Sequence, residues 1–132
     1  MRIKWLTKDY IQQQAEKGRK EALFCCRKHW LQLKFASPSQ LLRAIKNHAV
    51  TLRSTFCALC YLYNNKHCKS CPLVKCSCSL ERQTFWGKAI LAFNNWRAEQ
   101  TPSNWLKWEK ASQRMYDKID KVCRRLYPAE FK

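Results

Sequence analysis

The sequence is poor in residues that interrupt regular structure. Its 132 residues include only two glycines and four prolines, and no stretch has the composition of a linker. It also lacks internal repeats, low-complexity tracts and any apolar run approaching the roughly 18 residues that suggest a membrane-spanning helix. No apolar stretch follows the basic start MRIKWLTKDYIQQQ, so we expect no signal peptide. These absences favour one domain over residues 1–132, located in the cytoplasm and away from membranes.

Acidic residues are also scarce. The chain carries 26 lysines and arginines against nine acids, a formal net charge of +17. Between Glu21 and Glu81 there is no acidic residue, whereas this interval holds nine lysines and arginines and all three histidines. Charge of one sign at this density destabilises a compact state by self-repulsion. A negatively charged partner would relieve it, with nucleic acid the first candidate and an acidic protein surface the second.

Apolar residues recur at helical spacing, and no stretch alternates as a half-buried strand would. The spacing predicts helices over about 9–34, 38–53 and 79–99, and a fourth that starts at 102. Gly18 is expected to kink or divide the first helix, and a division would remove Arg19 from the apolar face. The residues predicted to face the core are Ile11, Ala15, Ala22, Cys26, Trp30, Leu33, Leu41, Ile45, His48, Ala49, Leu52, Phe85, Ala89, Phe93, Trp96, Trp105, Trp108, Ala111, Ser112, Met115, Ile119, Val122, Cys123 and Leu126.

Six of the nine cysteines lie in CALCYLYNNKHCKSCPLVKCSC, residues 57–78. Two Cys-x-x-Cys pairs can present four thiolates, which complete a tetrahedral Zn²⁺ shell. The predicted zinc ligands are Cys57, Cys60, Cys68 and Cys71, with Cys76, Cys78 and His67 as substitutes. The odd cysteine count and the absence of a secretory signal disfavour disulfides. An iron–sulfur cluster stays open as an alternative, although the spacing matches no ferredoxin pattern.

The predicted zinc is structural. A shell of four thiolates leaves no open position, and the only carboxylate near the segment is Glu81 at its far edge. The deaminase signature, a Ser/His/Asp set and a phosphate-cradling loop are all missing, so we expect no enzyme, with a Cys–His pair as the one catalytic arrangement left open. The expected fold is all-α, a small bundle of about four helices with a zinc-stapled loop between the second and third. Its parts are a basic helical pair (1–56), the zinc loop (57–78) and a second helical pair (79–132).

The stretch CALCYLYNNKHCKSCPLVKC resembles a family of small uncharacterised bacteriophage proteins. These share a CxxC, a tyrosine-bearing spacer, a CxxCP and a further cysteine, and the resemblance covers about residues 56–78. This sequence differs in having Cys76 and Cys78 close together. The resemblance implies a metal site, a phage or prophage origin and expression in a bacterial cytoplasm. It also implies that the protein modulates host or anti-phage defence machinery.

The basic residues of the first two helices and of the cysteine segment are the predicted contacts to nucleic acid, mainly to phosphates. They are Lys17, Lys20, Arg27, Lys28, Lys34, Arg43, Lys46, Arg53, Lys66, Lys69 and Lys75. The last three could instead offset the charge of the zinc thiolates. The expected function is that of a small basic zinc protein that binds RNA or DNA. The alternative is a non-enzymatic interaction protein that docks on and inhibits a host or defence complex, for example an RNA-guided nuclease.

Several remaining side chains have both a structural and a functional interpretation. Trp30, Trp96, Trp105 and Trp108 are expected in the core, whereas Trp5 and Trp86 are freer to stack on unpaired bases. Outside the segment, the residues expected to be buried thiols are Cys25, Cys26 and Cys123. The histidines expected to be core residues with satisfied hydrogen bonds are His29 and His48. Tyr61 and Tyr63 could stack on bases or cover the metal shell, and the second is favoured.

Overall fold

The computed structural model of this chain describes residues 3–50, 58 and 85–131. The described residues are helical and contain no strand, so the predicted all-α class is confirmed for this part of the chain. The elements are α1 (Lys8–Lys17), α2 (Arg19–Phe35), α3 (Pro38–Lys46), α5 (Phe85–Ala98), α6 (Pro102–Leu126) and the 3-10 helix η3 (Pro128–Phe131).

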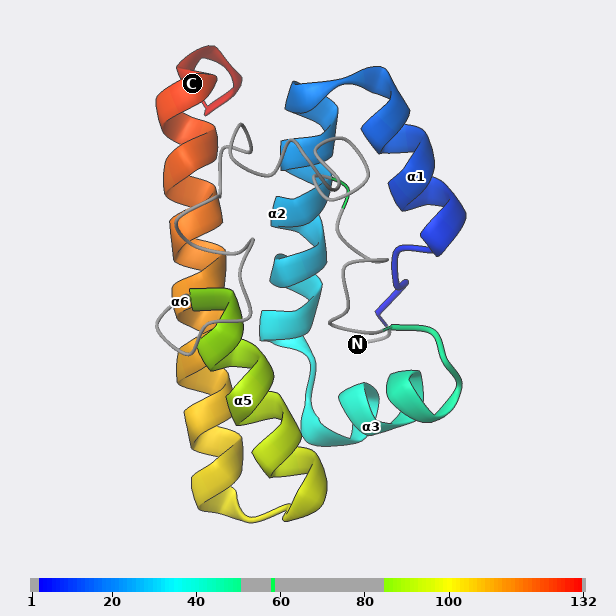
Figure 1. Cartoon of the computed structure of the whole chain (residues 1–132), viewed down its shortest axis with the longest axis vertical. Helices are drawn as coiled ribbons and strands as arrows, with labels where there is room; N and C mark the ends of the chain where they lie inside the picture. The colour runs from blue at the N-terminus through cyan, green and yellow to red at the C-terminus, as the bar shows by residue number, and fades with distance from the viewer. Residues whose placement is uncertain (1–2, 51–57, 59–84, 132) are drawn as a thin grey trace.

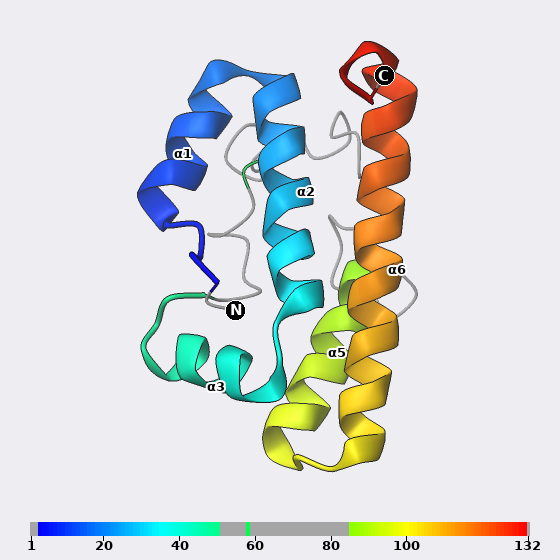
Figure 2. The ribbon, with the colours of Figure 1, turned by 180° about the vertical axis from the view of Figure 1, so that it is seen from behind.

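The two longest helices, α2 and α6, run antiparallel and side by side (Figure 1). α1 packs on α2 and α5 packs on α6, and the view from behind shows the same order (Figure 2). α3 lies across the end of α2, near the N-terminus (Figure 1). The centre is aromatic: the Trp108 ring lies 6.3 Å from Trp30 of α2 and 5.3 Å from Phe93 of α5, measured between centroids. Trp108 therefore joins three helices.

The first predicted helix is divided at Gly18. This residue has φ of 125°, a left-handed value that favours glycine, and it ends α1 and begins α2. The division also resolves the position of Arg19, which is exposed rather than in the core. Its Nε donates a hydrogen bond to Tyr127 Oη at 3.0 Å.

The second predicted helix is shorter than expected. α3 ends at Lys46 rather than near Arg53, because His48 adopts a left-handed φ of 56°. The amide of His48 donates to the carbonyl of Ile45, and that of Ala49 donates to Ala44, the pairing of a Schellman motif. His48 is consequently exposed, so its prediction as a core histidine was wrong, whereas His29 is buried as predicted.

Polar side chains cap the starts of three helices. Ser37 and Gln40 form a reciprocal capping box at the start of α3. Thr7 and Thr101 accept hydrogen bonds from the amides three residues later, at the starts of α1 and α6. The third predicted helix appears as α5 from Phe85 onward, and its expected start at residues 79–84 lies outside the described residues.

The predicted core is largely confirmed. All six residues predicted to face inward from the first helix are buried, as are Leu41, Ala89, Phe93, Trp96 and the central residues of α6. Trp105 is only half-buried and packs on Trp96 at 4.8 Å between centroids. Ile45, Ala49, Phe85, Ala111 and Leu126 are also half-buried, and Leu52 lies outside the described residues. Trp5 and Trp86 pack against the core and are half-buried.

The three cysteines outside the 57–78 segment are buried thiols, as predicted. They lie on α2 (Cys25 and Cys26) and on α6 (Cys123). Burial raises the pKa of Cys25 to about 11, against a small opposing effect of Lys28. Burial also raises the pKa of Cys123 to about 12. Cys25 and Cys123 are therefore protonated and unreactive at neutral pH.

Raising the pH above about 9 is expected to destabilise the protein, because the unfolded chain loses the Cys123 proton near the ordinary pKa of 9.0 whereas the folded chain keeps it until about 12. The contribution of this thiol is constant below that window and falls by about 1.4 kcal/mol per pH unit within it. Denaturant unfolding at about pH 8 and about pH 10.5 measures the fall. Cys123→Ala should show a shallower fall than the native protein, and equal slopes would contradict the assignment.

Candidate nucleic-acid interface

The predicted zinc site lies outside the described residues. This holds for Cys57, Cys60, Cys68, Cys71, Cys76, Cys78 and His67, and for the basic and aromatic residues Arg53, Tyr61, Tyr63, Lys66, Lys69 and Lys75. Within residues 3–50, 58 and 85–131, no three His, Cys, Asp or Glu side chains are grouped so that they could hold a metal ion. The zinc prediction therefore rests on the sequence.

The remaining predicted phosphate contacts are spread over three helices. Lys17 is on α1, Arg43 and Lys46 are on α3, and the other four are on α2: Lys20, Arg27, Lys28 and Lys34. Lys17, Lys28, Arg43 and Lys46 are exposed. The structure does not assemble them into one continuous face of free cations, because several of the α2 side chains have partners within the protein.

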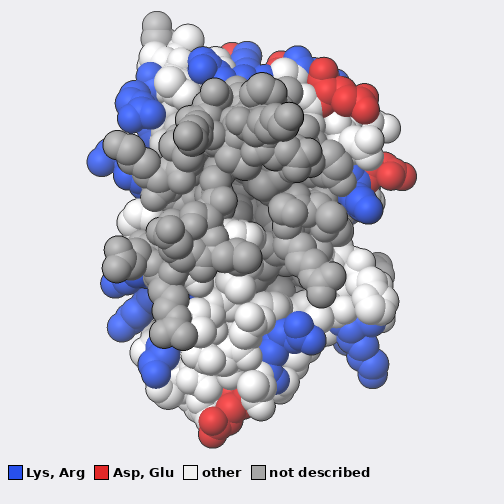
Figure 3. Space-filling model, in the orientation of Figure 1, with Lys and Arg blue, Asp and Glu red and all other residues white. Residues whose placement is uncertain are grey.

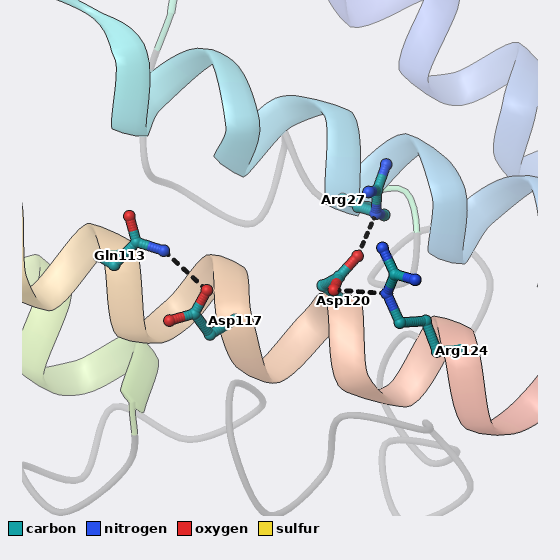
Figure 4. A network of polar contacts seen from close by, with 5 residues as sticks. All are labelled: Arg27, Gln113, Asp117, Asp120 and Arg124. Atoms are coloured by element: carbon teal, nitrogen blue, oxygen red, sulfur yellow. Dashed lines mark hydrogen bonds and ion pairs between the residues drawn. The ribbon is translucent and has the colours of Figure 1, made fainter. Parts of the chain in front are cut away.

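Arg27 has the most complete set of partners (Figure 4). Its Nε donates to Asp120 Oδ1 at 2.7 Å, while Arg124 Nε donates to Asp120 Oδ2 at 2.8 Å. The Arg27 guanidinium also lies 5.4 Å from the Tyr116 ring centroid and 5.3 Å from that of Phe131. Partial burial alone would raise the pKa of the Asp120 carboxyl, but the hydrogen bonds from the two arginines outweigh this and lower it. Arg27 therefore joins α2 to α6 rather than facing solvent freely.

Asp120→Asn is expected to destabilise the fold, because it removes the negative partner of two arginines, one of them only 27% exposed. The expected loss is about 1–3 kcal/mol of unfolding free energy at neutral pH. Asp117→Asn is the matched control, since Asp117 is exposed on the same helix and accepts a hydrogen bond from uncharged Gln113. Because the folded-state pKa of Asp120 is lowered, its stabilisation should fade as the pH drops below about 4. Equal effects of the two variants in denaturant unfolding would argue against a role for the pair.

Other α2 cations are also engaged. Lys20 Nζ lies 2.5 Å from Glu130 Oε1, and this hydrogen bond raises the pKa of the lysine. The ammonium of Lys34 lies 4.3 Å from the centroid of the Tyr116 ring, a cation–π contact across to α6. Lys28 lies 5.8 Å from the Tyr10 ring centroid. The sequence near α2 has few acids, but in the folded chain Asp120 of α6 and Glu130 of η3 pair with Arg27 and Lys20 of α2.

A different row of cations runs along α6. We name it the α6 stripe, and it consists of Lys107, Lys110, Arg114, Lys118, Lys121 and Arg125. The intervals of three or four residues place all six within an arc of about 80° at about 100° per residue, along about 27 Å of helix. Five are exposed and Lys118 is half-buried. No ion pair among the described residues involves any of the six.

Two of the α6 carboxylates are turned to other partners. Asp120 binds the two arginines described above, and Asp117 accepts from Gln113 Nε2 at 2.7 Å. The space-filling view shows blue side chains along the edge of the molecule where α6 runs (Figure 3). Asp117 keeps its charge beside the stripe, but the six cations outnumber it, so the stripe presents a net positive field that attracts polyanions.

The stripe borders a groove between α5 and α6. The groove has a volume of about 240 Å³ and is lined by Phe85, Lys88 and Ala92 of α5 and by Lys107, Lys110, Ala111 and Arg114 of α6. A second hollow of about 160 Å³ shares Lys88, Ala92 and Lys107 with it and adds Leu91 and Asn95. The Lys118 ammonium lies 6.0 Å from the Phe85 ring centroid. The four cations that line the groove thus surround a small apolar surface formed by Phe85, Ala92 and Ala111. This arrangement suits phosphate oxygens next to an apolar sugar or base.

Sequence reasoning missed this surface. The last 32 residues carry eight basic and four acidic side chains, and this segment total is unremarkable. The available signal was the helical angle of each residue: at about 100° per residue the six stripe cations fall within one arc that contains none of the α6 acids, with Asp117 next to its edge.

Searches of protein-family models, of curated protein sequences and of solved structures found no match to this chain. The resemblance of residues 56–78 to bacteriophage proteins therefore stays a prediction. Among the described residues, no helix is both long enough and apolar enough to cross a membrane. The molecule defined so far is a small helical protein with a strongly cationic helix face, and its function has to be inferred from that face.

Proposed function

We propose that this protein binds nucleic acid through the phosphate backbone, using the α6 stripe and the α5–α6 groove, with Zn²⁺ held by the 57–78 cysteines as a structural cofactor. The observation that carries the proposal is the row of six cations on one side of α6, none of which forms an ion pair within the part of the chain that the structure describes. Its even spacing over about 27 Å suits a polymer of regularly repeated anions.

A phosphate ligand explains this surface better than an acidic protein does. Lysine is depleted at protein–protein interfaces, whereas four of the six stripe residues are lysines. Protein–nucleic acid interfaces are strongly positive, and lysine and arginine make many of their phosphate contacts. The net charge of +17 would further accelerate association with a polyanion.

The test is binding of labelled single-stranded RNA, duplex RNA and duplex DNA by the zinc-loaded protein, from about 50 to about 300 mM salt. Engagement of about six phosphates predicts a slope near −5 in log affinity against log salt for duplex DNA. Absence of binding near about 150 mM salt for all three ligands would overturn the proposal. If the protein binds none of the three ligands but captures a protein partner, and nuclease treatment does not release that partner, the docking alternative would be favoured.

A further inference from the structure

A third hollow lies on a different part of the molecule, between the N-terminal segment and α3. Its volume is about 530 Å³, within the range of small-molecule sites. Its lining includes Ile3 and Trp5 from the N-terminal segment and Ser39, Arg43, Ala44 and Asn47 from α3 and the turn that follows. An aromatic ring, a cation and an amide therefore meet around one opening.

The backbone on either side of Trp5 is fixed to α2. The side chain of Gln32 accepts a hydrogen bond from the Leu6 amide at 3.1 Å and donates one to the Lys4 carbonyl at 2.6 Å. Leu6 is buried, and Thr7 then caps α1. Trp5 packs against the core but is only half-buried, so part of its ring is left to line the hollow. These contacts hold the segment that carries Trp5 against α2.

The opposite wall of the hollow is formed by α3 and by the turn that follows it. Ser39, Arg43 and Asn47 recur every four residues and are all exposed. Asn47 ends α3, where the Schellman hydrogen bonds fix the turn. No ion pair among the described residues involves Arg43. Ala44, small and buried, leaves room behind these side chains.

We propose that this hollow binds one unpaired nucleotide of a single-stranded nucleic acid. Trp5 would stack on the base, Arg43 would pair with a phosphate and the Asn47 amide would face the polar edge of the base. Unpaired bases are recognised in this way, by stacking on aromatic rings together with hydrogen bonds to their exposed edges. Paired bases in a duplex are unavailable for such stacking. The inference rests on the proposed function and adds to it a site that selects single strands.

The experiment measures affinity for a single-stranded oligonucleotide and for the duplex of the same sequence. Trp5→Ala is expected to weaken single-strand binding by about 5-fold to 150-fold and to change duplex binding little. Trp5→Phe should retain most of the affinity because it keeps a stacking ring. Trp105→Ala is the matched control, since Trp105 is also a half-buried tryptophan packed on the core but lines neither the hollow nor the α5–α6 groove. Thermal unfolding of each variant identifies losses due to misfolding.

Photo-cross-linking locates the contact. A single strand containing 5-iodouridine should cross-link to the peptide that contains Trp5, and the corresponding duplex should not. Arg43→Gln should weaken single-strand binding more than Lys8→Gln, which removes the same charge from an exposed position on α1. If the native protein binds no nucleic acid, the proposed function itself fails. If it binds but Trp5→Ala and Trp105→Ala behave alike and no Trp5 cross-link forms, this inference fails and the proposed function stands.

Discussion

Replacing Lys110, Arg114 and Lys121 by glutamine is expected to weaken duplex DNA binding about 100-fold at about 150 mM salt. These three side chains are exposed members of the α6 stripe, and none has an ion-pair partner among the described residues. Each lost phosphate contact removes about 0.9 from the salt slope, so the slope should decrease in magnitude by nearly three. Because the replaced side chains are outside the core, the melting temperature should change little.

The comparison variant carries Lys8→Gln, Lys17→Gln and Lys46→Gln. It lowers the net charge by the same three units, but its exposed lysines lie on α1 and α3. Long-range attraction alone should then cost only a few-fold in affinity, and the salt slope should be nearly unchanged. Because Lys17 and Lys46 are among the phosphate contacts predicted from the sequence, equal losses in the two triple variants would mean that the α6 stripe has no special role and that total charge or contacts on α1 and α3 suffice.

The parts of the fold that depend on neighbouring residues were predictable from sequence. The capping residues Thr7, Ser37 and Thr101 act on amides three positions away, and Gly18 supplies its own backbone freedom. The end of α3 was not predictable, because a histidine rather than a glycine takes the left-handed position after Asn47. Asn and His tolerate that conformation, but their presence does not demand it.

The charge pattern was harder to interpret, for a physical reason. An interval without acids along the chain suggested a basic face without ion pairs. In the structure, Arg27 pairs with Asp120, which is 93 residues away in the sequence, and Lys20 pairs with Glu130. Pairing between helices depends on how they pack, which a linear count of charges does not contain. The α6 stripe, by contrast, lies within one helix, so its spacing alone was sufficient to predict it.

Removal of zinc is expected to have the largest effect on stability. If Cys57, Cys60, Cys68 and Cys71 hold Zn²⁺, metal analysis should find one ion per chain, and replacement by Co²⁺ should give the absorption of a tetrahedral thiolate site. Structural zinc contributes about 10–16 kcal/mol in zinc-finger peptides at neutral pH, so even partial dependence would cost several kcal/mol here. Chelation should therefore lower the denaturation midpoint, and acid should release the metal as the thiolates become protonated.

Substitutions separate this site from the other cysteines. The double variant Cys57→Ser and Cys60→Ser should lose zinc, whereas Cys25→Ala should retain it, because Cys25 is a buried thiol of α2. Cys68→Ser compared with Cys76→Ser and Cys78→Ser would identify which thiolates complete the shell. A protein without zinc whose cysteines are oxidised would favour disulfides, and a coloured, iron-containing protein would favour a cluster. Either result would refute the zinc prediction and leave the test of the α6 stripe unaffected, since that surface is formed by residues 85–125.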